Sequence, residues 1–128
     1  MRALIVDDDP SMPGLMRRCF SLWGWDCDES RSVSAALGFF KQTHYDLALC
    51  DVDLPDGDGV FLACALSDEK PALRIVILSG DPRSVDRARA AGFNGCLHKP
   101  FDLSELKALI GREDRTVVDN SSSGPDRA

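Results

Sequence analysis

Side chains that could do chemistry follow four separate apolar runs of the sequence. A pair of carboxyl groups comes directly after Ala3–Val6, and a third carboxyl comes directly after Leu47–Cys50. A hydroxyl and an amine end two later apolar runs. The residues concerned are Asp7, Asp8, Asp51, Ser79 and Lys99. A sheet edge built only for stability would not need this set, so we interpret the five residues as a functional site.

These residue types suit phosphoryl transfer to a carboxylate. Two carboxylates about 5 Å apart repel each other by roughly 3 kcal/mol at an effective dielectric constant near 20, so a carboxylate cluster takes up protons or binds a cation. Oxygen ligands that only partly surround the ion suit Mg²⁺, which keeps waters and accepts phosphate oxygens. Asp51 would be the in-line nucleophile that gives an acyl phosphate. Lys99 would neutralise oxygens of the transferred group, and Ser79 would donate a hydrogen bond to one of them.

Short apolar strands alternate with amphipathic helices along the chain. The strands are predicted at 3–6, 25–28, 47–50, 73–78 and 96–98, with the second at a sheet edge because its residues alternate. Five helices are predicted from apolar residues that recur at helical spacing. The first two carry Leu15, Cys19, Leu22 and Trp23, and Val33, Ala36, Leu37 and Phe40. The third ends at Leu66, the fourth carries Val85, Ala88 and Ala91, and the fifth spans 103–110. Gly24 and Gly92 stop two of these helices, 55–59 is a turn, and Asp102 with Glu105 resembles a capping box.

This alternation predicts an α/β fold of (βα)₅ type. Apolar strands joined by helices form a doubly wound, five-stranded parallel sheet that is covered on both faces. Ligands of such sheets bind beyond the carboxyl ends of the strands, where the polar set above lies. We expect one domain over residues 1–111. Residues 112–128 lose the periodicity and are rich in Asn, Ser, Gly and Pro, so we expect a flexible tail or linker there.

The composition excludes several classes of protein. The chain of 128 residues has 15 Lys and Arg against 21 Asp and Glu, a net charge of −6, which argues against direct nucleic-acid contact and against electrostatic membrane binding. Of the 21 acidic residues only four are Glu, and seven of the 17 Asp lie in 7–9 and 51–58. The longest apolar run, Val60–Leu66, is too short to span a bilayer. Five Cys without a CxxC pair indicate reduced thiols in a cytoplasmic protein.

The order of these motifs resembles the receiver domain of two-component response regulators. The resemblance rests on Asp7-Asp8, on the segment from Asp51 to Gly59, on Ser79-Gly80 and on Lys99-Pro100-Phe101, and it covers residues 2 to about 111. Each motif is weak alone, but their order, spacing and placement at strand ends are together highly specific. The resemblance implies the flavodoxin-like strand order 2-1-3-4-5.

The family resemblance also implies a role for each residue of the set. Asp51 would be the phosphoacceptor, charged from a phosphohistidine on a sensor histidine kinase or phosphotransfer protein. Asp8 and Asp51 would bind Mg²⁺ through their side chains, Asp53 through its backbone carbonyl, and Asp7 mainly through a water. Ser79 and Lys99 would contact the phosphoryl group, and the Lys99-Pro100 bond is typically cis. The domain would catalyse its own phosphorylation and dephosphorylation without being an enzyme that turns over a substrate.

The sequence departs from the family at the output switch. Cys96 stands three residues before the Lys, where the family has Tyr or Phe, so an aromatic rotamer switch coupled to Ser79 cannot operate in its common form. The family's output face is the last strand and the last two helices, here roughly 83–110, where a downstream protein would bind. The sequence names no kinase, signal or target. It also leaves the oligomeric state open, including a dimer formed on phosphorylation.

Three other functions are compatible with parts of the pattern. A calcium loop that starts at Asp51 would need Asp or Asn at Pro55 and Glu at Leu62, so we reject it. A haloacid-dehalogenase phosphatase uses Asp-x-Asp, Ser, Lys and an acidic pair, but there the acidic pair comes last. A degenerate receiver would act as a phosphorylation-independent interaction module, and the complete polar set argues against it.

Overall fold

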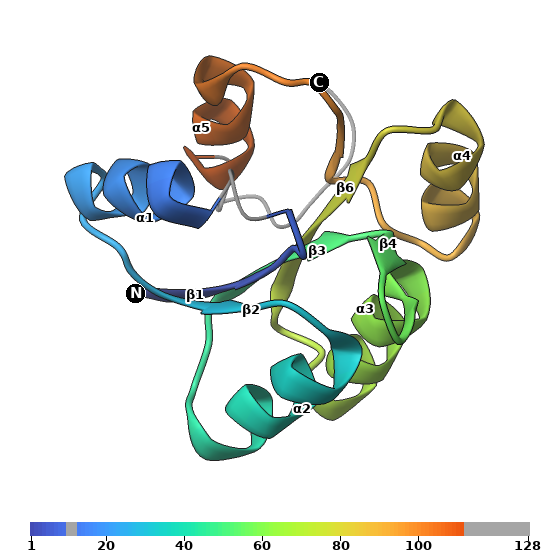
Figure 1. Ribbon diagram of the computed structural model, residues 1–128, viewed down its shortest axis with the longest axis horizontal. Helices are drawn as coiled ribbons and strands as arrows, with labels where there is room; N and C mark the ends of the chain where they lie inside the picture. The colour runs from blue at the N-terminus through green and yellow to red at the C-terminus, as the bar shows by residue number, and fades with distance from the viewer. Residues whose placement is uncertain (10–12, 112–128) are drawn as a thin grey trace.

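The computed structural model describes residues 1–9 and 13–111. The expected tail or linker, 112–128, lies outside the described residues. Five strands form one parallel sheet in the order β2-β1-β3-β6-β7, drawn in Figure 1. They are β1 (Arg2–Val6), β2 (Asp26–Ser30), β3 (Leu47–Asp51), β6 (Arg74–Ser79) and β7 (Cys96–His98). Counting only these strands, the order is 2-1-3-4-5, so the expected doubly wound fold and the edge position of β2 are confirmed.

Four helices connect the strands, a fifth follows the last strand, and together they cover both faces of the sheet. They are α1 (Pro13–Leu22), α2 (Val33–Gln42), α3 (Gly59–Glu69), α4 (Pro82–Ala90) and α5 (Leu103–Gly111). In Figure 1, α1 and α5 lie together on one side of the sheet, and α2 and α3 lie on the other. No helix among the described residues has the length and apolar content to cross a membrane.

The alternation of side chains along the central strands divides the core in two. Leu4 and Val6 of β1 belong to the cluster that α2, α3 and α4 cover, whereas Ala3 and Ile5 belong to the cluster under α1 and α5. Successive strand residues point to opposite faces, so a strand buried on both faces is a continuous apolar run. All four of these side chains are buried, and so is Asp7, the polar residue that follows them.

Several local predictions are confirmed at the helix ends. Gly24 and Gly92 have φ angles of 84° and 100°, which glycine adopts at no steric cost after a helix. The capping box at α5 is complete: the N–H of Asp102 donates to Glu105 Oε1 at 3.1 Å, and the N–H of Glu105 donates to Asp102 Oδ1 at 3.0 Å. The predicted turn at 55–59 overlaps a small antiparallel hairpin that the sequence did not indicate, formed by β4 (Asp53–Leu54) and β5 (Gly57–Asp58).

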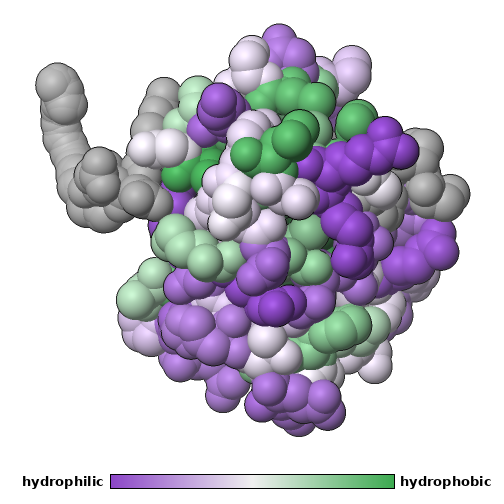
Figure 2. Space-filling model, turned by 90° about the vertical axis from the view of Figure 1, so that its left-hand side faces the viewer, coloured by the Kyte–Doolittle hydropathy of each residue, from purple (hydrophilic) through white to green (hydrophobic). Residues whose placement is uncertain are grey.

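The predicted apolar stripe of α1 is partly wrong. Leu15 and Leu22 are 49% and 84% exposed, although both were expected to face the core. The buried positions are Met16, Cys19 and Phe20, because the helix turns this row toward the sheet and leaves the two leucines beside it. Figure 2, which faces the side of the molecule where α1 lies, shows separate apolar patches among hydrophilic residues.

Candidate functional site

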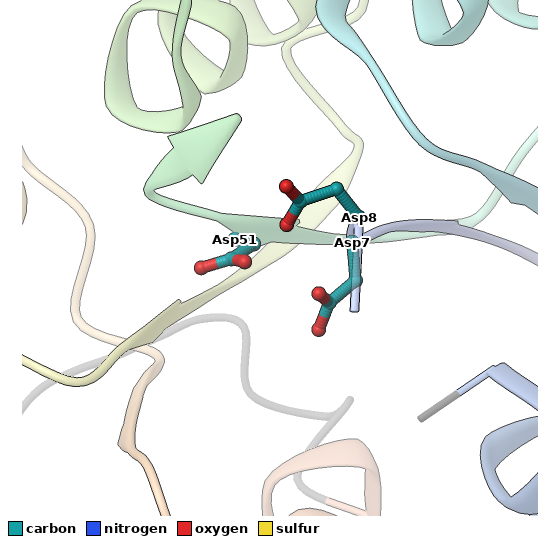
Figure 3. Close-up of side chains that lie close together, drawn as sticks. All are labelled: Asp7, Asp8 and Asp51. Carbon is teal, nitrogen blue, oxygen red and sulfur yellow. The ribbon is translucent and has the colours of Figure 1, made fainter. Parts of the chain in front are cut away.

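Three carboxylates meet at the carboxyl ends of two neighbouring strands. Val6 of β1 pairs with Cys50 of β3, so the residues that follow them emerge side by side. One carboxylate oxygen from each of Asp7, Asp8 and Asp51 lies within 4.8 Å of the others, and Figure 3 shows the two carboxylates at the end of β1 beside that of Asp51. Asp7 and Asp51 are buried and Asp8 is exposed. The structure therefore brings together the acidic residues that the sequence singled out.

Lys99 closes the group from the end of β7. Its Nζ donates to Asp7 Oδ2 at 3.0 Å and to Asp51 Oδ2 at 3.2 Å. Its own backbone N–H donates to the carbonyl of Ser79 at 2.6 Å, which continues the pairing of β6 with β7. The Lys99-Pro100 bond is cis, as the family resemblance implied. The ammonium of Lys99 thus contacts two of the three carboxylates.

Electrostatics leave this group short of positive charge. The pKa of Asp51 is raised to about 6: burial is the largest cause, the charge of Asp7 acts in the same direction, and Lys99 acts in the opposite direction. Burial works against the charged form of Lys99, but its bonds to Asp7 and Asp51 outweigh burial and raise its pKa. Closely spaced carboxylates that one lysine cannot neutralise form an arrangement that binds a cation.

The chemistry of this donor set fits Mg²⁺. Mg²⁺ prefers carboxylate, carbonyl and water oxygens, and one or two carboxylates with several waters are its usual protein ligands. Asp7, Asp8 and Asp51 supply such oxygens from two strands whose spacing the sheet fixes. Asp53, from which a backbone ligand was expected, lies two residues after Asp51 in β4 with its side chain exposed.

The backbone after Asp51 is packed against the first residue of α3. A Cβ added to Gly59 would lie 1.8 Å from the carbonyl oxygen of Asp51, so only glycine fits there. The N–H of Gly59 donates to the carbonyl of Val52 at 2.8 Å. This glycine lies in the segment predicted as a turn, and its close approach to the acidic strand end is a feature that only the structure shows.

Two aspartates of the same loop bind other elements. Asp56 accepts hydrogen bonds from the N–H groups of Val33 and Ser34, at 2.7 and 3.0 Å, at the start of α2. Asp58 caps α3 by accepting from the N–H of Val60 at 2.8 Å and is also 2.7 Å from Nη1 of Arg87 in α4. The sequence could have suggested the cap, because an Asp directly before a helical run is a typical N-cap; the contact with Arg87 had no local signal.

Ser79 lies at the site but is engaged in a turn. It is buried at the end of β6. Its hydroxyl donates to the carbonyl of Asp81 at 2.9 Å and accepts from the N–H of Asp81 at 3.0 Å. The neighbouring strand residue, Leu78, pairs with Asp51, so Ser79 comes from the strand next to the acidic strand end. Its hydroxyl would have to rotate to reach a group bound to Asp51.

Cys96 takes the position expected for the output switch. It is half-buried in β7, and its thiol donates to the carbonyl of Phe93 at 3.5 Å. Burial raises the pKa of this thiol, and the nearby Arg89 partly opposes that effect. The side chain packs against the core cluster under α4. It contributes to the packing between β7 and α4, but it has no ring that could turn between a buried and an exposed position.

Comparisons with known proteins agree with this geometry. The chain matches the family described as the response regulator receiver domain over residues 3–111. It is 36% identical to the sensor protein EvgS of Escherichia coli over 111 residues, which are 85% of this chain and 9% of that protein. The chain thus spans a small part of that relative.

Solved receiver structures have the same fold. A putative response regulator from Chloroflexus aurantiacus is 28% identical with a TM-score of 0.80, covering 88% of this chain and 95% of that chain. The response regulator TrrA of Thermotoga maritima, solved in complex with Mg(2+)-BeF, is 24% identical with a TM-score of 0.80, covering 88% and 97%. With the family matched over nearly all of the described residues, the chain belongs to the response regulator receiver domain family.

Proposed function

We propose that Asp51 accepts a phosphoryl group from a phosphohistidine of a sensor histidine kinase or phosphotransfer protein, in a Mg²⁺-dependent reaction that changes binding to a downstream protein. The observation that carries this proposal is the Lys99 ammonium, which contacts Asp7 at 3.0 Å and Asp51 at 3.2 Å at the carboxyl ends of parallel strands. Ligands of doubly wound sheets bind at that edge.

The chain's own residues account for the transfer. A carboxylate oxygen of Asp51 attacks phosphorus, the bond from phosphorus to the donor nitrogen breaks, and its electron pair stays with that nitrogen. Lys99 would neutralise one phosphoryl oxygen, and Ser79 would turn its hydroxyl from Asp81 toward another phosphoryl oxygen. The product is an acyl phosphate, and attack of water on its phosphorus would restore Asp51.

Mg²⁺ would be held by the side chains of Asp8 and Asp51 and by the backbone carbonyl of Asp53. Asp7 would act mainly through a water bound to the ion. The ion would shield the negative charge of Asp51 from the incoming phosphoryl group. The cluster of three carboxylates supports this assignment. The complex of TrrA with Mg(2+)-BeF supports it as well, since that protein has the same fold.

The output face and the setting belong to the same proposal. A downstream protein would bind at α4, β7 and α5, with Ser79 and Cys96 at the junction of that face and the site. A dimer formed on phosphorylation would use the same surface. We assign residues 1–111 to the receiver domain, which the family match over 3–111 supports. The free cysteines among the described residues support a reducing, cytoplasmic setting.

Phosphorylation with a small donor tests the proposal. The protein is incubated with phosphoramidate and Mg²⁺, and the intact mass is measured. Wild type should gain one phosphoryl group, and Asp51→Asn should gain none. Asp53→Asn is the matched control, because the same amide replaces a carboxyl two residues away while the backbone carbonyl remains, so it should still gain the group.

The control experiments separate the alternatives. Omission of Mg²⁺, or its removal with a chelator, should abolish the gain in wild type. No gain in wild type with several donors would overturn the proposal and favour the degenerate receiver, a module that binds partners without phosphorylation. A gain that persists in Asp51→Asn would place the acceptor elsewhere.

A further inference from the structure

A groove lies at the amino-terminal end of the sheet, away from the acceptor carboxylates. Its volume is about 230 Å³, and it is lined by Trp23, Trp25, Lys107, Ile110 and Gly111. Trp25 directly precedes β2, and Gly111 ends α5, which lies beside α1 in Figure 1. None of the groups assigned to phosphoryl transfer is among these lining residues, so the groove has no part in the reaction proposed above.

The turn after α1 fixes the aromatic walls of this groove. The N–H of Trp25 donates to the carbonyl of Phe20 at 2.8 Å. The N–H of Gly24 donates to the carbonyl of Ser21 at 3.1 Å, and the two bonds form a Schellman motif. The ring centroids of Trp23 and Trp25 lie 5.5 and 5.9 Å from that of the buried Phe20, both in edge contact. Because backbone bonds and a buried ring hold both tryptophans, a ligand would not have to order them.

The charge of the groove is positive. Its described lining residues include one cationic side chain and no carboxylate. The cation is Lys107 of α5, which is exposed and whose ammonium has no ion pair or hydrogen bond to another residue that the structure describes. Asp26, the residue after Trp25, does not line the groove and is 3.9 Å from Nη2 of Arg2. An anion in the groove therefore meets an attracting charge, and the neighbouring carboxylate already has a cationic partner.

The last turn of α5 does not oppose an anion either. The carbonyl end of a helix carries a partial negative charge, which by itself would repel a carboxylate. Here the carbonyls of Leu109 and Ile110 accept hydrogen bonds from Nη2 of Arg74 in β6, at 2.9 and 2.7 Å. The guanidinium charge offsets that end of the helix, so the groove combines aromatic walls with a positive potential.

We propose that this groove binds a small aromatic carboxylate, with its ring against Trp23 and Trp25 and its charge at Lys107. Aromatic rings pack favourably in edge or offset contact, and an ammonium donates charge-assisted hydrogen bonds to a carboxylate. The groove is smaller than the roughly 300–1,000 Å³ of sites for drug-sized ligands, so one or two rings with a short acidic chain suit it. This binding is separate from the phosphoacceptor function and does not depend on it.

The experiment follows the tryptophans, because the chain has two and both line the groove. The full chain, labelled with nitrogen-15, is titrated with naphthylacetate in the absence of Mg²⁺ and of any phosphoryl donor, and the indole N–H signals are followed by NMR. Naphthylacetamide is the matched ligand, since it has the same rings and nearly the same shape without the charge. The acid should shift both indole signals saturably, with a dissociation constant of about 1 mM for a ligand of this size. The amide should bind about two- to fivefold more weakly.

Two pairs of variants separate the charge from the rings. Lys107→Gln should weaken the acid about two- to fivefold, to the level of the amide, and leave the amide unchanged. Lys41→Gln in α2 is its matched control, because it removes the same charge from an exposed position that does not line the groove. Trp23→Leu should weaken acid and amide by the same factor, about threefold or more, because it removes a wall and not the charge. Leu22→Ala, at the neighbouring position that is 84% exposed, should change neither.

The other outcomes overturn the inference. The groove does not bind this class of ligand if neither indole signal shifts saturably, and it does not select an anion if acid and amide bind equally well. An equal loss in Lys41→Gln and Lys107→Gln would make net charge the cause. Urea unfolding shows whether each variant is folded, and if Trp23→Leu is not, the two lysine variants alone decide. Phosphorylation of Asp51 is measured separately and should not depend on these results, so failure of one proposal leaves the other standing.

Discussion

Carboxylates and cationic side chains lie at both ends of the central sheet, but the ratio of donors to carboxylates differs between the two ends. At the amino-terminal end, Arg2 at the start of β1 donates through Nη1 to Asp28 in the middle of β2 at 3.1 Å, and the hydroxyl of Tyr45, just before β3, donates to the same carboxylate at 2.6 Å. The backbone N–H of Arg2 donates to Asp46 at 2.9 Å. Each of these two carboxylates therefore has its own donors.

The carboxyl-terminal end is different, because Asp7 and Asp51 share the ammonium of Lys99, and the carboxylate of Asp8 lies beside them. The pKa of Asp51 is raised there to about 6, first by burial. Balanced charges at one end stabilise the fold, whereas the excess of carboxylates at the other end costs stability in the absence of a ligand. Strongly perturbed carboxyls of this kind are concentrated at functional sites. The comparison suggests that the same substitution should have opposite effects at the two ends.

The largest effect is expected where the carboxyl-terminal end is most tightly packed. Gly59→Ala would place Cβ 1.8 Å from the carbonyl oxygen of Asp51, so backbone would have to shift and the free energy of unfolding should fall by about 3 kcal/mol or more. Urea unfolding measures this change. Gly38→Ala in α2 is the matched control: no atom lies within 4 Å of its added Cβ, and it should stabilise by about 0.5–1 kcal/mol. Equal behaviour of the two variants would contradict the close approach.

Removal of one carboxylate charge from each end tests the comparison directly. Asp51→Asn should raise the free energy of unfolding by about 1–3 kcal/mol in metal-free buffer at pH 7, since it removes a carboxylate whose pKa is raised from 3.8 to about 6. Asp28→Asn should lower it by about 1 kcal/mol, since it weakens the bonds from Arg2 and Tyr45. Changes of the same sign in both variants would invalidate the contrast.

The pH dependence sharpens the result for Asp51. Because its pKa is raised on folding, the folded chain binds the proton more tightly than the unfolded chain does, and the cost of the carboxylate is complete only above pH 6. The stability advantage of Asp51→Asn should therefore shrink as the pH falls from 7 and disappear below the unfolded pKa of 3.8. Chemical unfolding of both proteins in chelator-containing buffer measures the difference, and an advantage that does not change with pH would refute this account.

A further effect at the carboxyl-terminal end is the stabilisation by the cation itself. Mg²⁺ at ten times its dissociation constant should add about 1.4 kcal/mol to the stability of wild type by mass action. A thermal melt with and without the ion measures it. Asp51→Asn should respond less, and Asp28→Asn should respond as wild type does, because that residue lies at the other end of the sheet. Insensitivity of wild type to millimolar Mg²⁺ would count against the metal site.

Much of the fold follows from the sequence because its signals are local. The run Ala3–Val6 can be buried on both faces only as an inner strand, and Asp102 with Glu105 forms its capping box within one helical turn. The polar residues at the strand ends could be placed together for the same reason, since parallel strands end at one edge. The burial of α1 was harder to predict, because Leu15 and Leu22 are as apolar as the buried Met16.

The features that the sequence did not indicate depend on contacts distant along the chain. Gly59 is required by the position of the Asp51 carbonyl, and Asp58 meets Arg87 across 29 residues. The turn that engages the Ser79 hydroxyl is local, but several residue types could form it. Such features arise from the packing of elements against one another, which a periodic pattern does not encode.

The hydrogen bond from the Lys99 N–H to the Ser79 carbonyl, at 2.6 Å, has a consequence for tolerance to change. Lys99 and Ser79 lie beside each other where the pairing of β6 with β7 ends. The distance between their Cα atoms therefore does not depend on the loops that follow them. Extra residues inserted beyond Asp81 would leave that spacing intact, whereas one inserted within β6 would move every following rung out of register. Among close relatives of this chain, variation in length is therefore expected after Asp81, between β6 and β7, and not within either strand.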